Sequence, residues 1–173
     1  AKDIVSGASF DNNLPCTSEK EVLAVASIAD LLKFEMLKHG AYELRDPADI
    51  ERLQALVVDG RHAVTGWIGK DASVILKEIG IEPPPGVKLI IAEVPFEHPF
   101  VRVELMMPIL PIVRVKDVEE GMDLAVIAER IRLVVEKART LLAGADPGEA
   151  LFLFLRAMVL QWGATDKGLV DRK

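Results

Sequence analysis

The stretch VKLIIAEV, residues 87–94, is the clearest strand signal in this sequence. It is a short, continuous apolar run, and PPPG at 83–86 forms a rigid connector ahead of it. A run without polar alternation is typical of a strand buried on both faces of a parallel sheet. The next apolar segment, ELMMPILPIVRV at 104–115, holds two prolines. These prolines predict an extended loop in its first half and a strand in its second half.

Strand and helix signals alternate from here back towards the amino terminus. EVLAVA at 21–26 is a compact, partly β-branched apolar run, which predicts a second buried strand. Ser27 can cap a helix that follows this run and ends at Gly40. Ahead of the run the chain reads as a loop, with a short helical turn predicted from Pro15 to Lys20.

Two further helices are predicted between these strands. One covers about 47–58 and is opened by Asp46 and the proline after it. The other follows the turn GWIGKDAS, with Asp71 as its cap, Gly80 as its end and Trp67 in the core. Helices that alternate with short apolar strands indicate an α/β fold. We therefore expect a parallel sheet with helices on both faces.

The character of the sequence changes from about residue 118. Apolar residues at helical spacing predict one helix there, and ALFLFLRAMVL at 150–160 predicts another, within about 147–162. The second is apolar on nearly every face but too short to span a membrane, which favours a buried helix or an oligomer contact. The sequence therefore predicts an α-helical C-terminal tail. The stripe of the first helix is Leu124, Ile127, Ile131, Val134, Ala138 and Leu141.

Composition predicts a folded, acidic protein. The chain has 173 residues, 50% apolar and 28% charged, with a net charge of -6. We expect one domain with an appendage, and we expect no nucleic-acid partner. The three histidines, His39, His62 and His98, are scattered, so no metal site is predicted. No signal peptide or membrane span is evident, and a cytoplasmic location is expected.

Cys16 is the only cysteine, and it lies in the polar stretch SFDNNLPCTSEKE at 9–21. A cysteine kept for packing usually has apolar neighbours, so this setting raises the possibility of a reactive thiol. At the start of a helix, the helix dipole and backbone N–H groups would stabilise a thiolate and an oxyanion. The alternative is a spectator cysteine near a loop, because no histidine base lies nearby in the sequence.

Two other segments stand out less on physical grounds. Glu104 precedes an apolar run that ends in proline. On physical grounds alone, the favoured interpretation is that Glu104 is a surface residue at the edge of a strand. GWIGKD lacks the spacing of a phosphate-binding loop, and it reads as a turn and a helix cap. His98, directly before a proline, reads as structural.

Three segments taken together resemble a known family. ASFDNNLPCTSEKEV, GWIGKDA and HPFVRVELMMPILPIVRVKD occur in this order. They resemble the CoA-acylating aldehyde dehydrogenases of bacterial propanediol and ethanolamine utilisation, a branch of the aldehyde dehydrogenase superfamily. The resemblance implies that Cys16 is the catalytic cysteine. ELMMPIL is similar to the superfamily's E-x-F-G-P segment, which implies that Glu104 binds the nicotinamide ribose. Met106 falls where an aromatic residue usually contacts the cofactor.

The resemblance also implies a reaction and a fold, and it covers only part of the chain. Cys16 would oxidise a short-chain aldehyde with NAD through a thiohemiacetal and a thioester, and coenzyme A would accept the acyl group. The implied fold is the Rossmann-like catalytic domain of the superfamily, in part, over residues 1–125. Residues 126–173 do not match, and the family's dinucleotide-binding domain and its oxyanion-side asparagine have no counterpart here. Members often lie inside bacterial microcompartments. We expect the chain to be inactive alone.

Two alternatives stay open at this point. The chain could be a non-catalytic or engineered α/β fragment whose tail helices cover surfaces that another domain once covered. It could instead be an assembly module that forms a homo-oligomer through its apolar C-terminal helix. Binding of NAD or coenzyme A would distinguish the dehydrogenase from both alternatives.

Overall fold

In a computed structural model of the protein, the structure describes residues 1–128. By its internal contacts the chain divides into two units, residues 1–125 and residues 126–173. The fold and the sites below belong to the first unit. The apolar helix expected within 147–162, and most of the helical stripe that starts at Leu124, lie outside the described residues.

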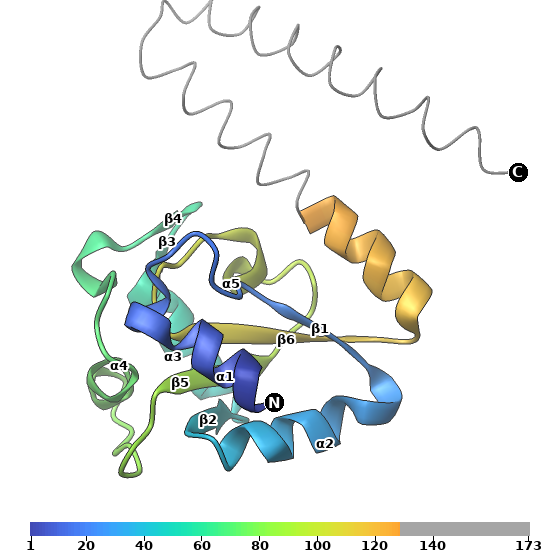
Figure 1. Cartoon of the computed structure of the whole chain (residues 1–173). Helices are drawn as coiled ribbons and strands as arrows, with labels where there is room; N and C mark the ends of the chain where they lie inside the picture. Colours follow the sequence, from blue (N-terminus) through green and yellow to red (C-terminus); the bar gives the residue numbers. More distant parts are fainter. Residues whose placement is uncertain (129–173) are drawn as a thin grey trace, which may run out of the picture. The chain divides into compact units, whose positions relative to one another are not determined.

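The first unit is built on a sheet of four parallel strands (Figure 1). Across the sheet their order is β1-β6-β5-β2, so the two strands formed by 89–93 and 109–115 are central. The expected strands are all present, and the expected α/β fold is confirmed. The expected strands are β1 (Val22–Val25), β5 (Leu89–Glu93) and β6 (Ile109–Val115), whereas the edge strand β2 (Ala41–Leu44) was not predicted.

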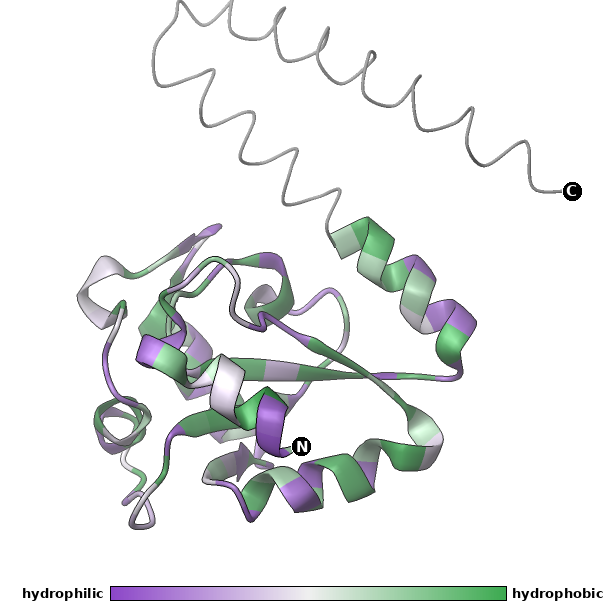
Figure 2. Cartoon of the chain, viewed as in Figure 1, coloured by the Kyte–Doolittle hydropathy of each residue, from purple (hydrophilic) through white to green (hydrophobic). Residues whose placement is uncertain are grey.

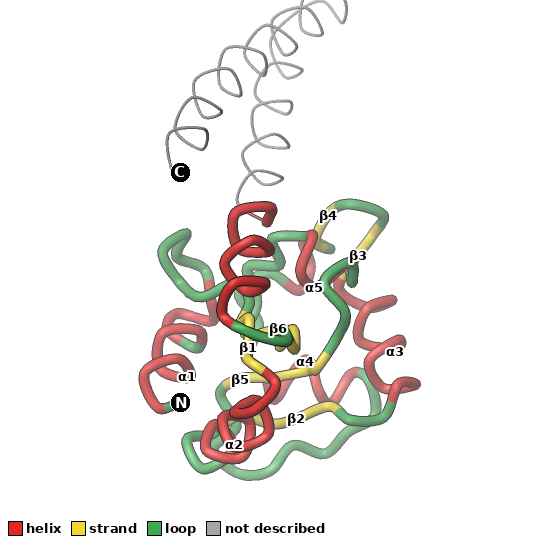
Figure 3. The backbone as a smooth tube through the Cα atoms, turned by 90° about the vertical axis from the view of Figure 1, so that its right-hand side faces the viewer, coloured by secondary structure: helices red, strands yellow, loops and turns green. Residues whose placement is uncertain are grey.

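Helices cover both faces of this sheet, as expected. Figure 3 shows α1 and α2 on one side of the strands and α3 on the other. A small antiparallel pair, β3 and β4, follows α3, and another helix begins at residue 118. The bounds are α1 (Lys2–Ala8), η1 (Phe10–Asn13), α2 (Ala26–Leu37), α3 (Pro47–Val57), β3 (Val58–Asp59), β4 (His62–Ala63), η2 (Thr65–Trp67), α4 (Ala72–Glu78) and α5 (Pro99–Arg102).

The core explains why β5 is apolar throughout. Leu89 and Ile91 belong to the buried cluster that joins the sheet to α1 and α2, and both are 0% exposed. Successive side chains of a strand point to opposite faces, so Ile90 and Ala92 point to the other face, where they are equally buried. Hydrophobic residues therefore fill both sides of the central strands, and the ribbons of β5 and β6 are coloured mostly as hydrophobic in Figure 2. Each large apolar side chain buried in this way contributes about 1.5–3 kcal/mol.

Pro111 lies inside β6, a central strand, where a proline is uncommon. The amides of Ile90 and Val94 donate to the carbonyls of Pro108 and Ile112 at 2.8 and 3.0 Å, so even-numbered residues of β6 bond to β5. Pro111 therefore faces the β1 side, and pairing with β1 begins only at Ile112. The missing N–H falls just outside that ladder, which makes the proline compatible with the strand.

Three local predictions were wrong. Trp67 is half-buried in the surface turn η2 and does not reach the core. Residues 2–8 form α1 where a loop was expected, and the turn predicted at Pro15 is present but short, closed by the Ser18 amide on the Pro15 carbonyl at 3.0 Å. Ser27 lies inside α2, since the chain turns into the helix directly after β1 and Val25 becomes the N-cap.

Candidate functional site

The turn that carries Cys16 lies just ahead of β1, at the amino end of the sheet. The thiol is exposed. The residues after it form a turn and a short extended connection, and no helix starts there. The prediction that a helix dipole stabilises the Cys16 thiolate is therefore wrong. Any activation of the thiol has to come from neighbouring side chains and loops.

An unusual backbone conformation positions this turn. Asp11, Asn12 and Asn13 have φ angles of 46°, 53° and 63°, three successive non-glycine residues in the left-handed region. Asn and Asp tolerate this region better than other residues with a side chain. Asn13 is only 2% exposed, and its Nδ2 donates to the carbonyls of Ala8 at 2.9 Å and Glu19 at 2.8 Å. The side chain of Asn13 therefore ties both ends of the loop together.

The loop GWIGKD lies against the cysteine loop. Asn12 Nδ2 donates to the carbonyl of Gly69 at 2.9 Å and to Asp71 Oδ1 at 2.8 Å. Asp71 is the N-cap residue of α4, as expected, but its side chain serves this contact and makes no cap hydrogen bond. Gly69 has φ 71°, and a Cβ there would lie 3.4 Å from Leu14 Cδ1. The positive φ favours glycine at this point, whereas a Cβ would meet Leu14 only at an ordinary contact distance.

The third segment meets the other two through its backbone. The amide of Gly69 donates to the carbonyl of Met106 at 3.0 Å. Met106 has φ 53°, which is rare for a residue with a side chain, and it is half-buried. Strained backbone of this kind gathers at functional sites, where the surrounding contacts hold it in place. The three segments behind the family resemblance are thus joined by hydrogen bonds.

Lys20 links the cysteine turn to Glu104. Its Nζ donates to the carbonyl of Pro15 at 3.3 Å and lies 3.7 Å from Glu104 Oε1. The Glu104 side chain is 47% exposed, so its carboxylate is open to a ligand. Within residues 1–128, no direct hydrogen bond or ion pair joins Cys16 itself to Glu104 or Met106.

Sequence reasoning missed Lys20 and Asn12. Lys20 stands in the charged run SEKE, which reads as a solvated surface, yet its side chain is only 11% exposed. The contacts of Asn12 with Gly69 and Asp71 span 57 and 59 residues of sequence. One local signal existed: two successive asparagines ahead of a proline favour left-handed backbone and tight loops.

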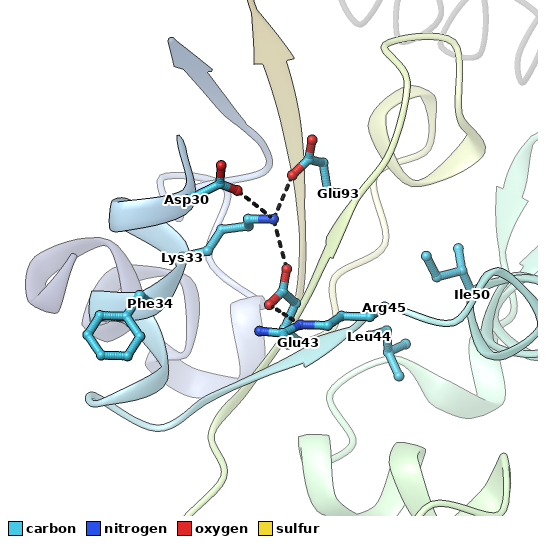
Figure 4. A pocket seen from close by; sticks show the side chains of 8 residues that line it. All are labelled: Asp30, Lys33, Phe34, Glu43, Leu44, Arg45, Ile50 and Glu93. Carbon is cyan, nitrogen blue, oxygen red and sulfur yellow. Dashed lines mark hydrogen bonds and ion pairs between the residues drawn. The ribbon is translucent and has the colours of Figure 1, made fainter. Parts of the chain in front are cut away.

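A second polar cluster lies at the opposite, carboxyl end of the strands. It borders an open pocket of about 330 Å³ beside α2. Lys33 Nζ lies 2.6 Å from Glu93 Oε2 and 2.9 Å from Glu43 Oε1, and Arg114 pairs with Glu93 and Asp30, both at 2.7 Å. Charges of opposite sign therefore satisfy one another here. The lining residues are Asp30, Lys33, Phe34, Glu43, Leu44, Arg45, Ile50 and Glu93 (Figure 4).

Electrostatics at this cluster favour a structural role. The hydrogen bond from Arg114, helped by Lys33 and opposed by burial, lowers the pKa of Glu93 to about 2. Glu93 is therefore ionised throughout the physiological range and holds α2 against the sheet.

Across the part of the chain that the structure describes, no group of three or more potential ligand side chains is arranged to hold a metal ion. The helices of this described part are all too short or too polar to cross a bilayer.

Known proteins resemble this chain over about three quarters of its length. The acetylating acetaldehyde dehydrogenase of Bilophila wadsworthia is 40% identical over 144 residues, which are 75% of this chain and 29% of that protein. Propionaldehyde dehydrogenase of Rhodopseudomonas palustris, solved with bound CoA and an acylated cysteine, is 53% identical with a TM-score of 0.72. That match covers 73% of this chain and 29% of the other. This chain is a partial homologue of the CoA-acylating aldehyde dehydrogenases.

A third similar protein adds a biological setting. The propionaldehyde dehydrogenase of a fucose utilisation microcompartment in Clostridium phytofermentans is 43% identical with a TM-score of 0.71, over 74% of this chain and 29% of that one. No family model matches the chain. The chain thus spans less than a third of the CoA-acylating aldehyde dehydrogenases named here.

Proposed function

We propose that Cys16 is the nucleophile of a CoA-acylating aldehyde dehydrogenase, of which residues 1–125 form part of the catalytic domain. The observation that carries the proposal is the meeting of three loops. Asn12 holds Gly69, Gly69 holds Met106, and Lys20 bridges the Cys16 turn and Glu104. Loops that are distant in sequence and strained in backbone meet at the loop that carries the exposed Cys16, as the parts of an active site do.

Glu104 and Met106 are proposed to face the cofactor NAD. The Glu104 carboxylate is half-exposed and can accept hydrogen bonds from the two hydroxyls of a ribose, so the residue fits that role. Met106 offers a flexible thioether surface where an aromatic ring usually lies in the superfamily. Bound NAD would supply the hydride acceptor, a function that no side chain of the protein can perform.

Cys16 would carry the acyl group between two substrates. Its sulfur attacks the carbonyl carbon of a short-chain aldehyde, and an S–C bond forms. After oxidation the same carbon is a thioester, which the thiol of coenzyme A attacks. The C–S bond to Cys16 then breaks, acyl-CoA leaves, and the thiolate is restored. An exposed cysteine on a surface turn suits this exchange, since both partners have to reach the same sulfur from solution.

The proposal extends to the tail and the location. Residues 126–173 are proposed to be a helical tail outside the catalytic region. Self-association through the segment expected within 147–162 stays a prediction. A cytoplasmic location, within a microcompartment as for the Clostridium phytofermentans protein, is part of the same proposal.

Acyl transfer tests the proposal without a nicotinamide cofactor. The purified chain is incubated with propionyl-CoA, and peptides are analysed by mass spectrometry under conditions that preserve thioesters. We expect one propionyl group on the peptide that contains Cys16, and none in Cys16→Ala. A chain that stays unmodified while a free thiol in the same mixture is acylated would contradict the assignment.

A further inference from the structure

We propose that Lys20 is a positioning residue that fixes the Cys16 turn relative to Glu104 and places a positive charge beside that turn. The inference rests on the proposed function, because it concerns the same site. It goes beyond that function in assigning a role to a residue outside the three predicted site residues.

The ammonium group of Lys20 has several polar partners in this region and is largely buried. Its Nζ donates to Asn13 Oδ1 at 2.7 Å, to the Asn13 carbonyl at 3.1 Å and to the Pro15 carbonyl at 3.3 Å. The same ammonium lies 3.7 Å from Glu104 Oε1, and the side chain is only 11% exposed. A charge this far out of water requires polar partners, and these atoms supply them.

These contacts join the two halves of the candidate site. Asn13 and Pro15 belong to the loop that presents Cys16, whereas Glu104 belongs to the segment that leads into β6. Asn13 is held in the left-handed region, with φ 63°, so its conformation depends on the contacts around it. A compact ammonium with three donors can satisfy acceptors from several directions, which suits this cluster of carbonyls and carboxylate.

The charge has a measurable consequence at the cysteine. Nζ contacts the carbonyl of Pro15, the residue directly before Cys16. Two charges closer than about 8–10 Å still interact at ordinary ionic strength. Lys20 should therefore favour an anionic reagent over a neutral one at Cys16, and Glu104 should oppose this preference. A purely structural lysine would change both reagents' rates equally.

The test compares alkylation of Cys16 by iodoacetate, which is anionic, with alkylation by iodoacetamide, which is neutral. The measured quantity is the ratio of their rate constants, followed by mass spectrometry at low ionic strength. We expect Lys20→Met to lower this ratio about two- to fourfold, the size expected for one charge through a solvated distance of this order. Lys20→Arg should restore most of it. Lys77→Met is the matched control, since Lys77 is 59% exposed and pairs with Glu82.

A second variant keeps the test valid if Lys20→Met fails to fold. Glu104→Gln removes the opposing charge and keeps the shape, so the iodoacetate to iodoacetamide ratio should rise by a similar factor. Hydrogen exchange should also speed up around Asn13 in Lys20→Met and recover in Lys20→Arg. Folded variants with the wild-type ratio, or a Glu104→Gln ratio that does not rise, would overturn the proposal.

Failure of the function and failure of this inference give different results. Alkylation needs no acyl donor and no cofactor. A chain that is not acylated by propionyl-CoA but shows the charge effect refutes the proposed reaction and supports the role of Lys20. A chain that is acylated at Cys16, with a ratio indifferent to Lys20, supports the reaction and refutes the role of Lys20.

Discussion

At the scale of single residues, the candidate site depends on side chains whose partners are far away in sequence. Cys16 could be singled out from the sequence because a lone thiol in a polar stretch is conspicuous. Asn12 and Lys20 could not, because nothing local shows that they reach Gly69 and Glu104. Trp67 was wrongly placed in the core for a related reason. A large apolar residue looks buried in a sequence, yet here it lies in a surface turn.

Gly69 offers a test at this scale. Gly69→Ala should lower the free energy of unfolding by about 1–2 kcal/mol, because alanine is strained at positive φ. Gly66→Ala is the control, since a Cβ at Gly66 meets nothing within 4 Å and its φ is not positive. Urea unfolding measures both. Equal stabilities of the two variants would show that the loop is not held as described.

At the scale of elements, most helices and the three strands at 22–25, 89–93 and 109–115 were predictable, whereas α1, β2 and the junctions were not. The apolar runs of β5 and β6 identified buried strands because both faces of a parallel sheet are covered. Asp46 was correctly predicted to open a helix, and its Oδ1 accepts from the Ala48 amide at 2.9 Å. The predicted cap of α2 was wrong. The turn at Pro15 does not extend into a helix, because β1 begins at Val22 and leaves too few residues for one.

The ion pairs between α2 and the strand ends predict an acid-sensitive element. Because the pKa of Glu93 is lowered to about 2, its contribution to stability is complete above the unfolded value of 4.5 and is lost as pH falls through about 2. At neutral pH, Glu93→Gln should cost about 1–2 kcal/mol, after a discount for a side chain that is 32% exposed. The variant should also lose less stability than wild type between pH 4.5 and pH 2.

The control for Glu93 is Glu82, whose side chain is 84% exposed. Glu82→Gln should change neither the stability at neutral pH nor its dependence on acid. Thermal unfolding followed by circular dichroism across this pH range compares the three proteins. A wild-type profile in Glu93→Gln would mean that the network contributes nothing measurable.

At the scale of the whole molecule, the α/β architecture and the family were accessible from the sequence, but the activity of this chain on its own is a separate question. The chain covers 28–29% of the similar dehydrogenases from Bilophila wadsworthia and Rhodopseudomonas palustris. Hydride transfer requires a nicotinamide held against the substrate carbon. We therefore expect the 173-residue chain alone to give no NAD reduction with propionaldehyde and CoA. Turnover that disappears in Cys16→Ala would show that the region is self-sufficient.

We propose that the fold, and not the thiol alone, makes Cys16 an acceptor of acyl groups. The most direct measurement is the rate constant for acyl transfer from propionyl-CoA to Cys16 in the folded chain, divided by the rate constant for the same chain unfolded in urea. Corrections for the effect of urea come from a peptide of residues 9–21. We predict a ratio well above one, because the loops of Asn12, Gly69 and Glu104 form only in the folded state. A ratio of one or less would contradict the account.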